Sequence, residues 1–175
     1  MQKEYTYNKD LNRMLFLITF AGIIPLIIIF ISYISNPNSY LIRIIFDNTQ
    51  NIPSVISSYN PVMTKVMDIY CKSAPLLAFI AFIILFRHTR EPKITDRKKI
   101  ITACILSSFL CIFYAYFFLW HNFELTTSGR PVRLMSENDL TLLIFYICLY
   151  YCSFFITYAL CLQPVIAYKL WKERQ

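Results

Sequence analysis

Glycine and charge are both scarce in this sequence. Only 2 of its 175 residues are Gly, and 15% are Asp, Glu, Lys or Arg. Soluble domains average roughly 25% charged residues, so the low value argues against a soluble protein. Hydrophobic residues make up 57% of the chain, with 15 Phe and 13 Tyr. This composition excludes an intrinsically disordered chain. It is typical of a polytopic membrane protein with no separate soluble domain.

The motifs of catalysis are also missing. The sequence has no glycine-rich phosphate-binding loop, no nucleophile with an evident His partner and no paired carboxylates within an apolar block. Its six cysteines raise the alternative of a membrane redox enzyme, but they form no CxxC pair, and cysteine in lipid packs as a small apolar residue. His88 and His121 fall in separate loops. We therefore expect no catalytic residue, no metal and no cofactor.

Four long apolar blocks dominate the chain. A helix needs about 20 apolar residues to cross a hydrocarbon core of roughly 30 Å. Pro25 and Pro75 lie inside two of the blocks and predict bends there. We predict an all-α fold, with residues 1–175 forming a single integral membrane domain built as a compact four-helix bundle. The predicted transmembrane helices are 14–34, 66–86, 100–120 and 140–162, with outer loops 35–65 and 121–139 and an inner loop 87–99.

The basic residues predict the orientation, because Lys and Arg concentrate in short cytoplasmic loops near helix ends. Most of the 17 Lys and Arg fall in the two termini and in loop 87–99, and only five fall elsewhere. We therefore place both termini in the cytoplasm. This orientation explains the basic loop, so nucleic-acid binding is not expected. Three of the blocks lack an ionisable residue, which argues against an ion pathway. A small four-helix transporter or channel stays as the alternative function.

Three charges stand where the second apolar block begins. Lys65, Asp68 and Lys72 are spaced three and four residues apart, so they share one side of a helix. Asn60-Pro61 predicts the start of that helix. A helix from there to Phe86 exceeds the hydrocarbon core, so we expect its first two turns to stand in the outer headgroup layer. The charges then stabilise the helix locally or contact an arriving partner.

Small residues recur along the third apolar block. Such stripes allow helix backbones to approach closely within a membrane. They serve packing among the four helices, docking of a foreign membrane helix, or both. The stripe consists of Ala103, Ser107, Cys111 and Ala115.

The two outer loops carry further candidate contacts. In the first, four apolar residues between 41 and 45 surround Arg43 and are followed by Asp47, which suits a short helix lying in the membrane interface. In the second, a Gly-Arg-Pro turn stands among clustered opposite charges. The candidate partner-binding charges there are Glu124, Arg130 and Arg133.

The chain resembles the immunity proteins against pore-forming colicins of the A type. The resemblance covers essentially the whole length. The segments that carry it are GIIPL (22–26), SSYNPVMTKVMDIYCKSAP (57–75), NFELTTSGRPVRLM (122–135) and the ending KERQ (172–175).

This resemblance implies a location, a partner and a function. Members reside in the bacterial inner membrane as four helices with both termini cytoplasmic, and the topology reached above from charge agrees with this. They protect a colicin-producing cell by binding the pore-forming domain of the cognate colicin, a membrane-inserted helical hairpin, and preventing channel opening. The resemblance therefore implies that the lipid bilayer and this toxin domain are the partners.

Overall fold

The computed structural model describes residues 2–86 and 97–172. Side chains are described from residue 12 onward, except at 97–100, at Ala103 and at a few positions after 166. Most of the predicted inner loop 87–99 therefore lies outside the described residues. The described elements, in chain order, are α1 (Gln2–Ala21), α2 (Ile24–Ser35), α3 (Tyr40–Asn48), β1 (Val55–Ile56), α4 (Pro61–Cys71), α5 (Ala74–Phe86), α6 (Arg97–Tyr114), the π-helical η1 (Ala115–Trp120), β2 (Phe123–Glu124), the 3-10 helix η2 (Leu125–Thr127), α7 (Arg130–Ser136) and α8 (Asp139–Lys172).

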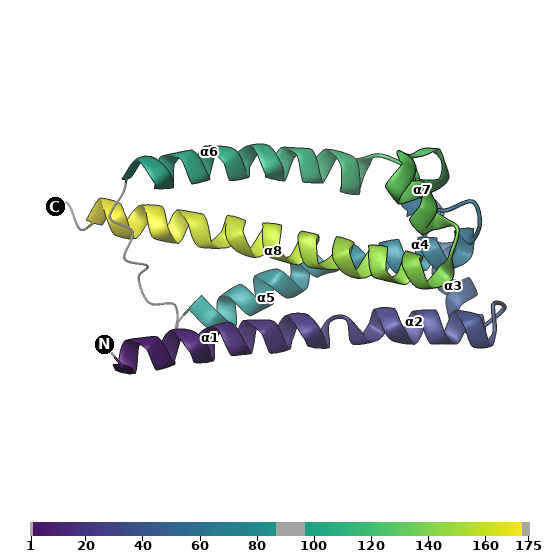
Figure 1. The fold of residues 1–175 in the computed structure, drawn as a ribbon, viewed down its shortest axis with the longest axis horizontal. Helices are drawn as coiled ribbons and strands as arrows, with labels where there is room; N and C mark the ends of the chain where they lie inside the picture. The colour runs from purple at the N-terminus through teal and green to yellow at the C-terminus, as the bar shows by residue number, and fades with distance from the viewer. Residues whose placement is uncertain (1, 87–96, 173–175) are drawn as a thin grey trace.

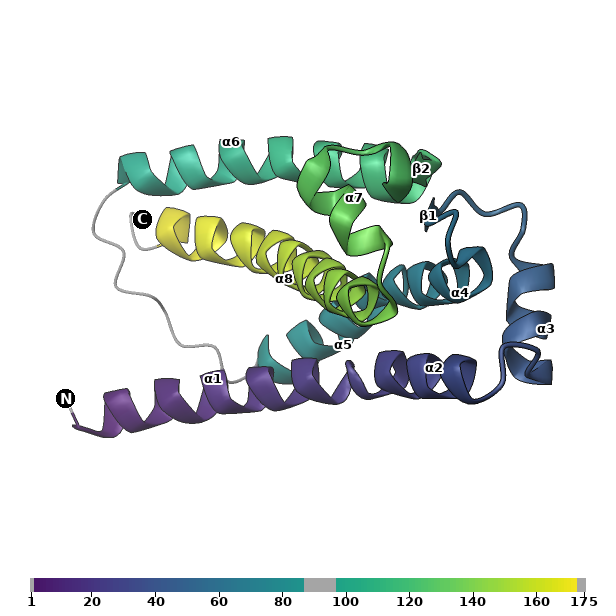
Figure 2. The same ribbon diagram turned by 45° about the vertical axis from the view of Figure 1, so that its right-hand side comes forward.

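The long helices run side by side along the length of the molecule (Figure 1). The start of α1 and the end of α8 lie at one end, while α3, α7 and the two short strands lie at the other (Figures 1 and 2). The predicted all-α class is confirmed, since the described strands have two residues each. Three helical stretches are long and apolar enough to cross a membrane, and Cys104–Trp120 is a shorter apolar helix. The three stretches are Asn12–Ser35, Pro61–Phe86 and Asp139–Ile166.

Two of these stretches are broken close to their prolines, where bends were predicted. The first breaks at Gly22-Ile23 and the second at Lys72-Ser73, so the helical stretch predicted from Pro61 to Phe86 is present and is interrupted just before Pro75. Proline lacks the N–H that would continue the helical hydrogen-bond ladder. The Tyr70 hydroxyl donates to the Gly22 carbonyl oxygen at 2.6 Å. This bond satisfies a backbone group that the first break exposes, as lipid requires.

The close approach of the Tyr150 side chain requires glycine at position 22, in the first break. A Cβ atom at Gly22 would overlap the hydroxyl and ring of Tyr150. The rings of Tyr70 and Tyr150 are stacked, with centroids 5.8 Å apart. The two breaks and the middle of α8 therefore meet at one level of the bundle.

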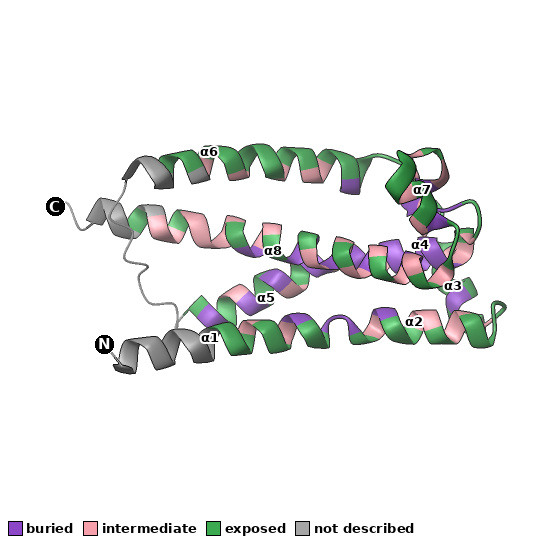
Figure 3. Ribbon diagram, in the orientation of Figure 1, coloured by how far each residue is buried: buried purple, intermediate pink, exposed green. Residues whose placement is uncertain are grey.

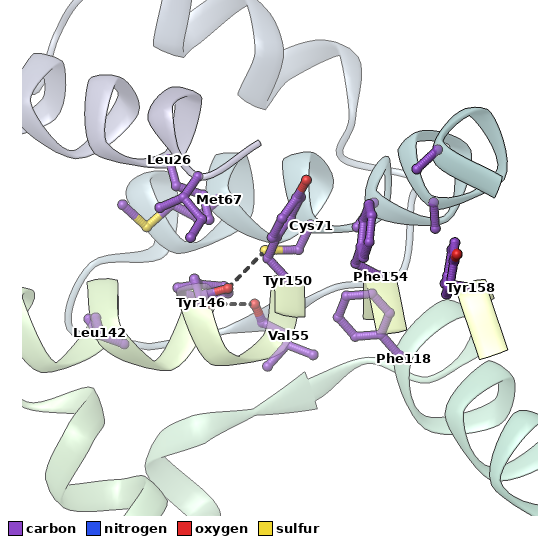
Figure 4. Close-up of a cluster of buried hydrophobic side chains, with 14 of the residues drawn as sticks. Leu26, Val55, Met67, Cys71, Phe118, Leu142, Tyr146, Tyr150, Phe154 and Tyr158 are labelled. Atoms are coloured by element: carbon purple, nitrogen blue, oxygen red, sulfur yellow. Dashed lines mark hydrogen bonds between the residues drawn. The ribbon is translucent and has the colours of Figure 1, made fainter. Parts of the chain in front are cut away.

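The core joins an aromatic row on α8 to a row of small residues on α5. The two helices share the most extensive contact between any two described elements. Side chains four apart fall on one side of a helix, and small residues opposite large rings let the backbones approach. Figure 4 shows the aromatic row within the core. The buried residues are Tyr146, Tyr150, Phe154 and Tyr158 on α8 and Ala74, Ala78, Ala81 and Leu85 on α5.

Helix α8 is longer than predicted. It continues through Pro164 to Lys172, whereas we expected a transmembrane helix ending near residue 162. A proline inside a helix destabilises it less where neighbouring groups bond to the carbonyl oxygen that the proline leaves without a donor.

Helix α6 packs beside α8 and exposes most of its other sides (Figure 3).

Candidate functional site: buried charges beneath two joined loops

Helix α4 is enclosed by protein on all sides. Six consecutive residues, 63–68, are buried, although a surface helix buries only one stripe. The enclosing elements are α2, α3, β1 and α8. This enclosure determines the environment of the three charges predicted from the sequence.

Those charges are removed from solvent. Lys65 is 6% exposed and Asp68 is fully buried, while the Lys72 side chain is 11% exposed. The sequence predicted that these charges stand in the headgroup layer at the outer end of a helix, and the structure adds that protein encloses them. The reason is a tertiary contact, because the segment 52–55 folds back over α4.

Each charge has a partner in this arrangement. Lys72 Nζ lies 2.7 Å from Asp68 Oδ2. Lys65 Nζ donates to Ser54 Oγ at 2.8 Å and also to the Ile52 carbonyl oxygen, and Lys72 Nζ also donates to the Pro53 carbonyl oxygen. Burying a charge without such partners costs several kcal/mol. The cluster thus fixes the first outer loop onto α4.

The same cluster reaches the end of the third apolar block. Lys72 Nζ lies 5.6 Å from the centroid of the buried Phe118 ring in η1, a distance at which a cation is attracted to the ring face. Asp68 Oδ1 has no hydrogen-bond partner among the described residues. Asp68 is therefore balanced mainly by the Lys72 ammonium, which both pairs with its charge and donates a hydrogen bond to Oδ2.

The two predicted outer loops are joined by backbone pairing. Strands β1 and β2 are parallel, with Val55 opposite Phe123 and Ile56 opposite Glu124. The Ser54 N–H donates to Asn122 Oδ1 at 2.9 Å, and the Phe123 N–H donates to the Ser54 carbonyl oxygen at 3.1 Å. Residues 52–60 and 122–139 therefore form one unit, which we call the joined-loop surface.

Side chains extend this joint to α8. Ser57 Oγ donates to the Ser136 carbonyl oxygen at 3.1 Å, and the Asn60 amide donates to the Asp139 carboxylate. From the core, the Tyr146 hydroxyl donates to the Val55 carbonyl oxygen at 2.8 Å (Figure 4). Sequence reasoning treated the loops separately, because two-residue strands leave no periodic signal.

The candidate charges of the second loop differ in exposure. Glu124 is half-buried and accepts hydrogen bonds from Ser58 Oγ and from Thr126 Oγ1, the latter at 2.6 Å. Arg130 and Arg133 on α7 are exposed. Glu124 therefore holds the two loops together, while the arginines are available to a partner.

The small-residue stripe of α6 packs within the chain. Ser107, Cys111 and Ala115 are half-buried, on the helix that contacts α8. Ser107 Oγ donates to Gln163 Oε1 at 2.6 Å. The fourth member, Ala103, lies outside the described side chains. Internal packing thus accounts for this side of α6, and docking of a foreign helix there stays a prediction.

The cysteines do not assemble into a site. Within the described residues all six are free thiols, and no three His, Cys, Asp or Glu side chains gather as a metal site would require. Cys71 is buried and donates to the Tyr146 carbonyl oxygen at 3.3 Å. Its environment is that of a core residue.

Comparison with known proteins identifies the family. Residues 38–175 match the family model described as colicin immunity protein. The chain is 50% identical over 170 residues to the colicin-A immunity protein of Citrobacter freundii, covering 97% of this chain and 96% of that protein. It is 33% identical over 168 residues to the colicin-B immunity protein of Escherichia coli, covering 96% of each. No solved structure matches the chain. The chain therefore belongs to the colicin immunity protein family and is an immunity protein against a colicin.

Proposed function

We propose that this chain protects a colicin-producing bacterium by binding the pore-forming domain of an A-type colicin within the inner membrane, which prevents channel opening. The observation that carries the proposal is the joined-loop surface, in which two loops are hydrogen-bonded to each other at one end of an apolar helical bundle. A toxin that inserts from outside meets that end first. Recognition needs no catalytic group, and the non-enzymatic role that the family suggests fits this mode of action.

The proposed topology has four membrane crossings with both termini in the cytoplasm. Helix α6 and η1 together run from Arg97 to Trp120, a length of about 36 Å at 1.5 Å per residue. That is enough to cross a hydrocarbon core of roughly 30 Å. The start of α1 and the end of α8 lie at the same end of the bundle (Figure 1), as an even number of crossings requires.

The buried cluster acts in this proposal by positioning. Lys65, Asp68 and Lys72 hold the segment 52–54 in place, and the exposed Arg130 and Arg133 contact the toxin. Confinement of both proteins to one bilayer raises their effective concentration, so modest affinity suffices. Discrimination between related colicins then depends on differences in shape and charge, including repulsive ones.

A cross-protection assay tests the function. Sensitive cells that express the chain are challenged with colicin A, colicin B, other A-type pore formers and a nuclease colicin. We expect survival with one A-type toxin and killing by the nuclease toxin. Killing by every A-type toxin, at a verified membrane level of the protein, would contradict the proposal. Solute flux through liposomes that contain the purified chain would instead favour the transporter alternative.

A loop exchange tests the site. The donor is the colicin-B immunity protein, which is 33% identical to this chain. Exchanging 122–139 alone joins a foreign second loop to the native first loop, across the side-chain contacts of Asn122 with Ser54 and of Glu124 with Ser58, so we expect protection to be lost without a new specificity. Exchanging 52–60 and 122–139 together should give this chain protection against colicin B. Full transfer by the single exchange would show that the second loop acts alone.

A further inference from the structure

Helix α3 has three distinct sides. Ile42 is 3% exposed and the half-buried Phe46 follows it by four residues, on the side that contacts α4. Arg43 and Asp47 are exposed together on a second side. At about 100° per residue, the remaining apolar residues fall on the third side. These are Tyr40, Leu41, Ile44 and Ile45, all exposed. Asn48 shares this side at the last turn, where its amide donates to the Ile44 carbonyl oxygen at 2.9 Å.

The place of α3 in the fold is set by a short connection. Only residues 36–39 separate the end of α2 from the start of α3, and four residues span at most about 14 Å. The connection is a tight turn in which the Ser39 N–H donates to the Asn36 carbonyl oxygen at 3.0 Å. Arg43 Nη2 also donates to Asn38 Oδ1 at 2.8 Å. Because α2 completes a stretch apolar enough to cross a membrane, the start of α3 is held within about 14 Å of the end of that stretch.

The orientation of α3 agrees with that place. It lies across the end of the bundle, whereas α2 and α4 run along the bundle (Figure 2). A helix that lies flat at a bilayer surface buries its apolar side about 5–10 Å into the boundary between headgroups and acyl chains, and keeps its charges in water. The third side of α3 and its charged side fit that arrangement.

We propose that α3 is an interfacial helix that places Tyr40, Leu41, Ile44 and Ile45 in the lipid bilayer at the headgroup boundary. The proposal rests on the proposed function and topology in one respect only, namely that the leaflet which α3 enters is the outer one. Arg43 and Asp47 balance each other, so the interaction is with the apolar boundary of any phospholipid and needs no anionic headgroup. The helix leads directly into the segment 52–54 that Lys65 and Lys72 bind. It thereby sets the depth of the joined-loop surface relative to the membrane.

Tryptophan fluorescence of the full chain in phosphatidylcholine vesicles tests this. Trp120 and Trp171 are replaced by Phe, and Leu41→Trp is compared with the matched variant Asp47→Trp on the charged side. With lipids brominated near the headgroup end of the acyl chain, Leu41→Trp emission should fall about twofold or more, and aqueous iodide should leave it nearly unchanged. Asp47→Trp should respond in the reverse way.

Two results would overturn the proposal. Quenching of Leu41→Trp by iodide and not by brominated lipid would place this side in water. Protection from both quenchers at every lipid-to-protein ratio would show that protein, such as a second copy, covers it. If Leu41→Trp fails to accumulate, Ile45→Trp reports from the same side. The measurement contains no colicin, so its outcome is separate from that of the protection assay.

Discussion

Helices α4 and α5 are consecutive parts of one membrane-length stretch, yet they are built in opposite ways. Helix α4 is surrounded by protein and buries Lys65 and Asp68 together with its apolar residues. Helix α5 contains no charge and buries only four positions, all towards the core. Six of its other side chains are exposed and suit contact with lipid, and the remaining three are half-buried (Figure 3). The two helices meet at the break after Cys71.

The difference shows which of the two helices can accommodate charged side chains. A charge that faces lipid is costly at mid-bilayer, so α5 is restricted to apolar residues. Apolar residues alone distinguish poorly between one protein partner and another. The enclosed half holds charges because loop carbonyls and an opposite charge surround them. Substitutions at the enclosed half, at the break, along α6 and on the exposed loop surface should therefore have decreasing effects on stability.

The largest effect is expected for Asp68→Asn. This change leaves two buried ammonium groups without their counter-charge, which costs about 3–5 kcal/mol of unfolding free energy. We expect a lower denaturation midpoint in detergent and a lower membrane level. The matched control is Asp47→Asn, an exposed aspartate on α3, which should change little. The double replacement Asp68→Leu/Lys72→Met should recover part of the loss, because it removes the ion pair as a whole. Equal midpoints for Asp68→Asn and Asp47→Asn would show that α4 is not enclosed as described.

The second prediction concerns the break in the first stretch. Gly22→Ala introduces a Cβ that overlaps the Tyr150 hydroxyl, and overpacking of this kind costs about 1–3 kcal/mol. Tyr150→Phe removes that hydroxyl, which has no partner among the described residues, so alone it should be nearly neutral. The double variant should recover part of the loss in a double-mutant cycle of detergent unfolding. Strictly additive effects would contradict the contact.

The positions of the helices could be predicted because apolar length, charge and proline are local properties of the sequence. The end of the third block at Trp120 and the bends near Pro25 and Pro75 were all predictable in this way. The burial of Lys65 was not, because its partners Ile52 and Ser54 come from a loop without any distinctive pattern. From the sequence alone, a charge at the end of an apolar block is equally compatible with a solvated and with an enclosed position. Only the contact of Lys65 with the segment 52–54 distinguishes the two positions.

The third prediction addresses α6, which packs against α8. Ser107→Leu should separate α6 from α8 and remove the bond to Gln163, with a loss of about 1–2 kcal/mol and reduced protection. Ser108→Leu makes the same chemical change at the next residue, which is exposed, and should leave stability and protection intact. Similar behaviour of the two variants in unfolding and colicin assays would show that the stripe does not pack closely.

The smallest effect on stability is expected on the exposed side of the joined-loop surface. Arg130→Glu and Arg133→Glu should change the unfolding free energy by less than about 0.5 kcal/mol. They should nevertheless weaken protection against the cognate colicin, measured as the lowest toxin dose that kills. Unchanged killing doses for both variants would move the toxin contact away from α7.

The pairing of β1 with β2 also has a consequence for the order of assembly during synthesis. Ser57 bonds to a residue 79 positions later, and Val55 to one 91 positions later. While the ribosome is still producing the third and fourth apolar blocks, residues 52–60 have none of these partners. Contacts this distant in sequence form late and slowly. A newly made chain therefore forms its helices before the joined-loop surface, which is complete only once α8 has been made and has packed against it.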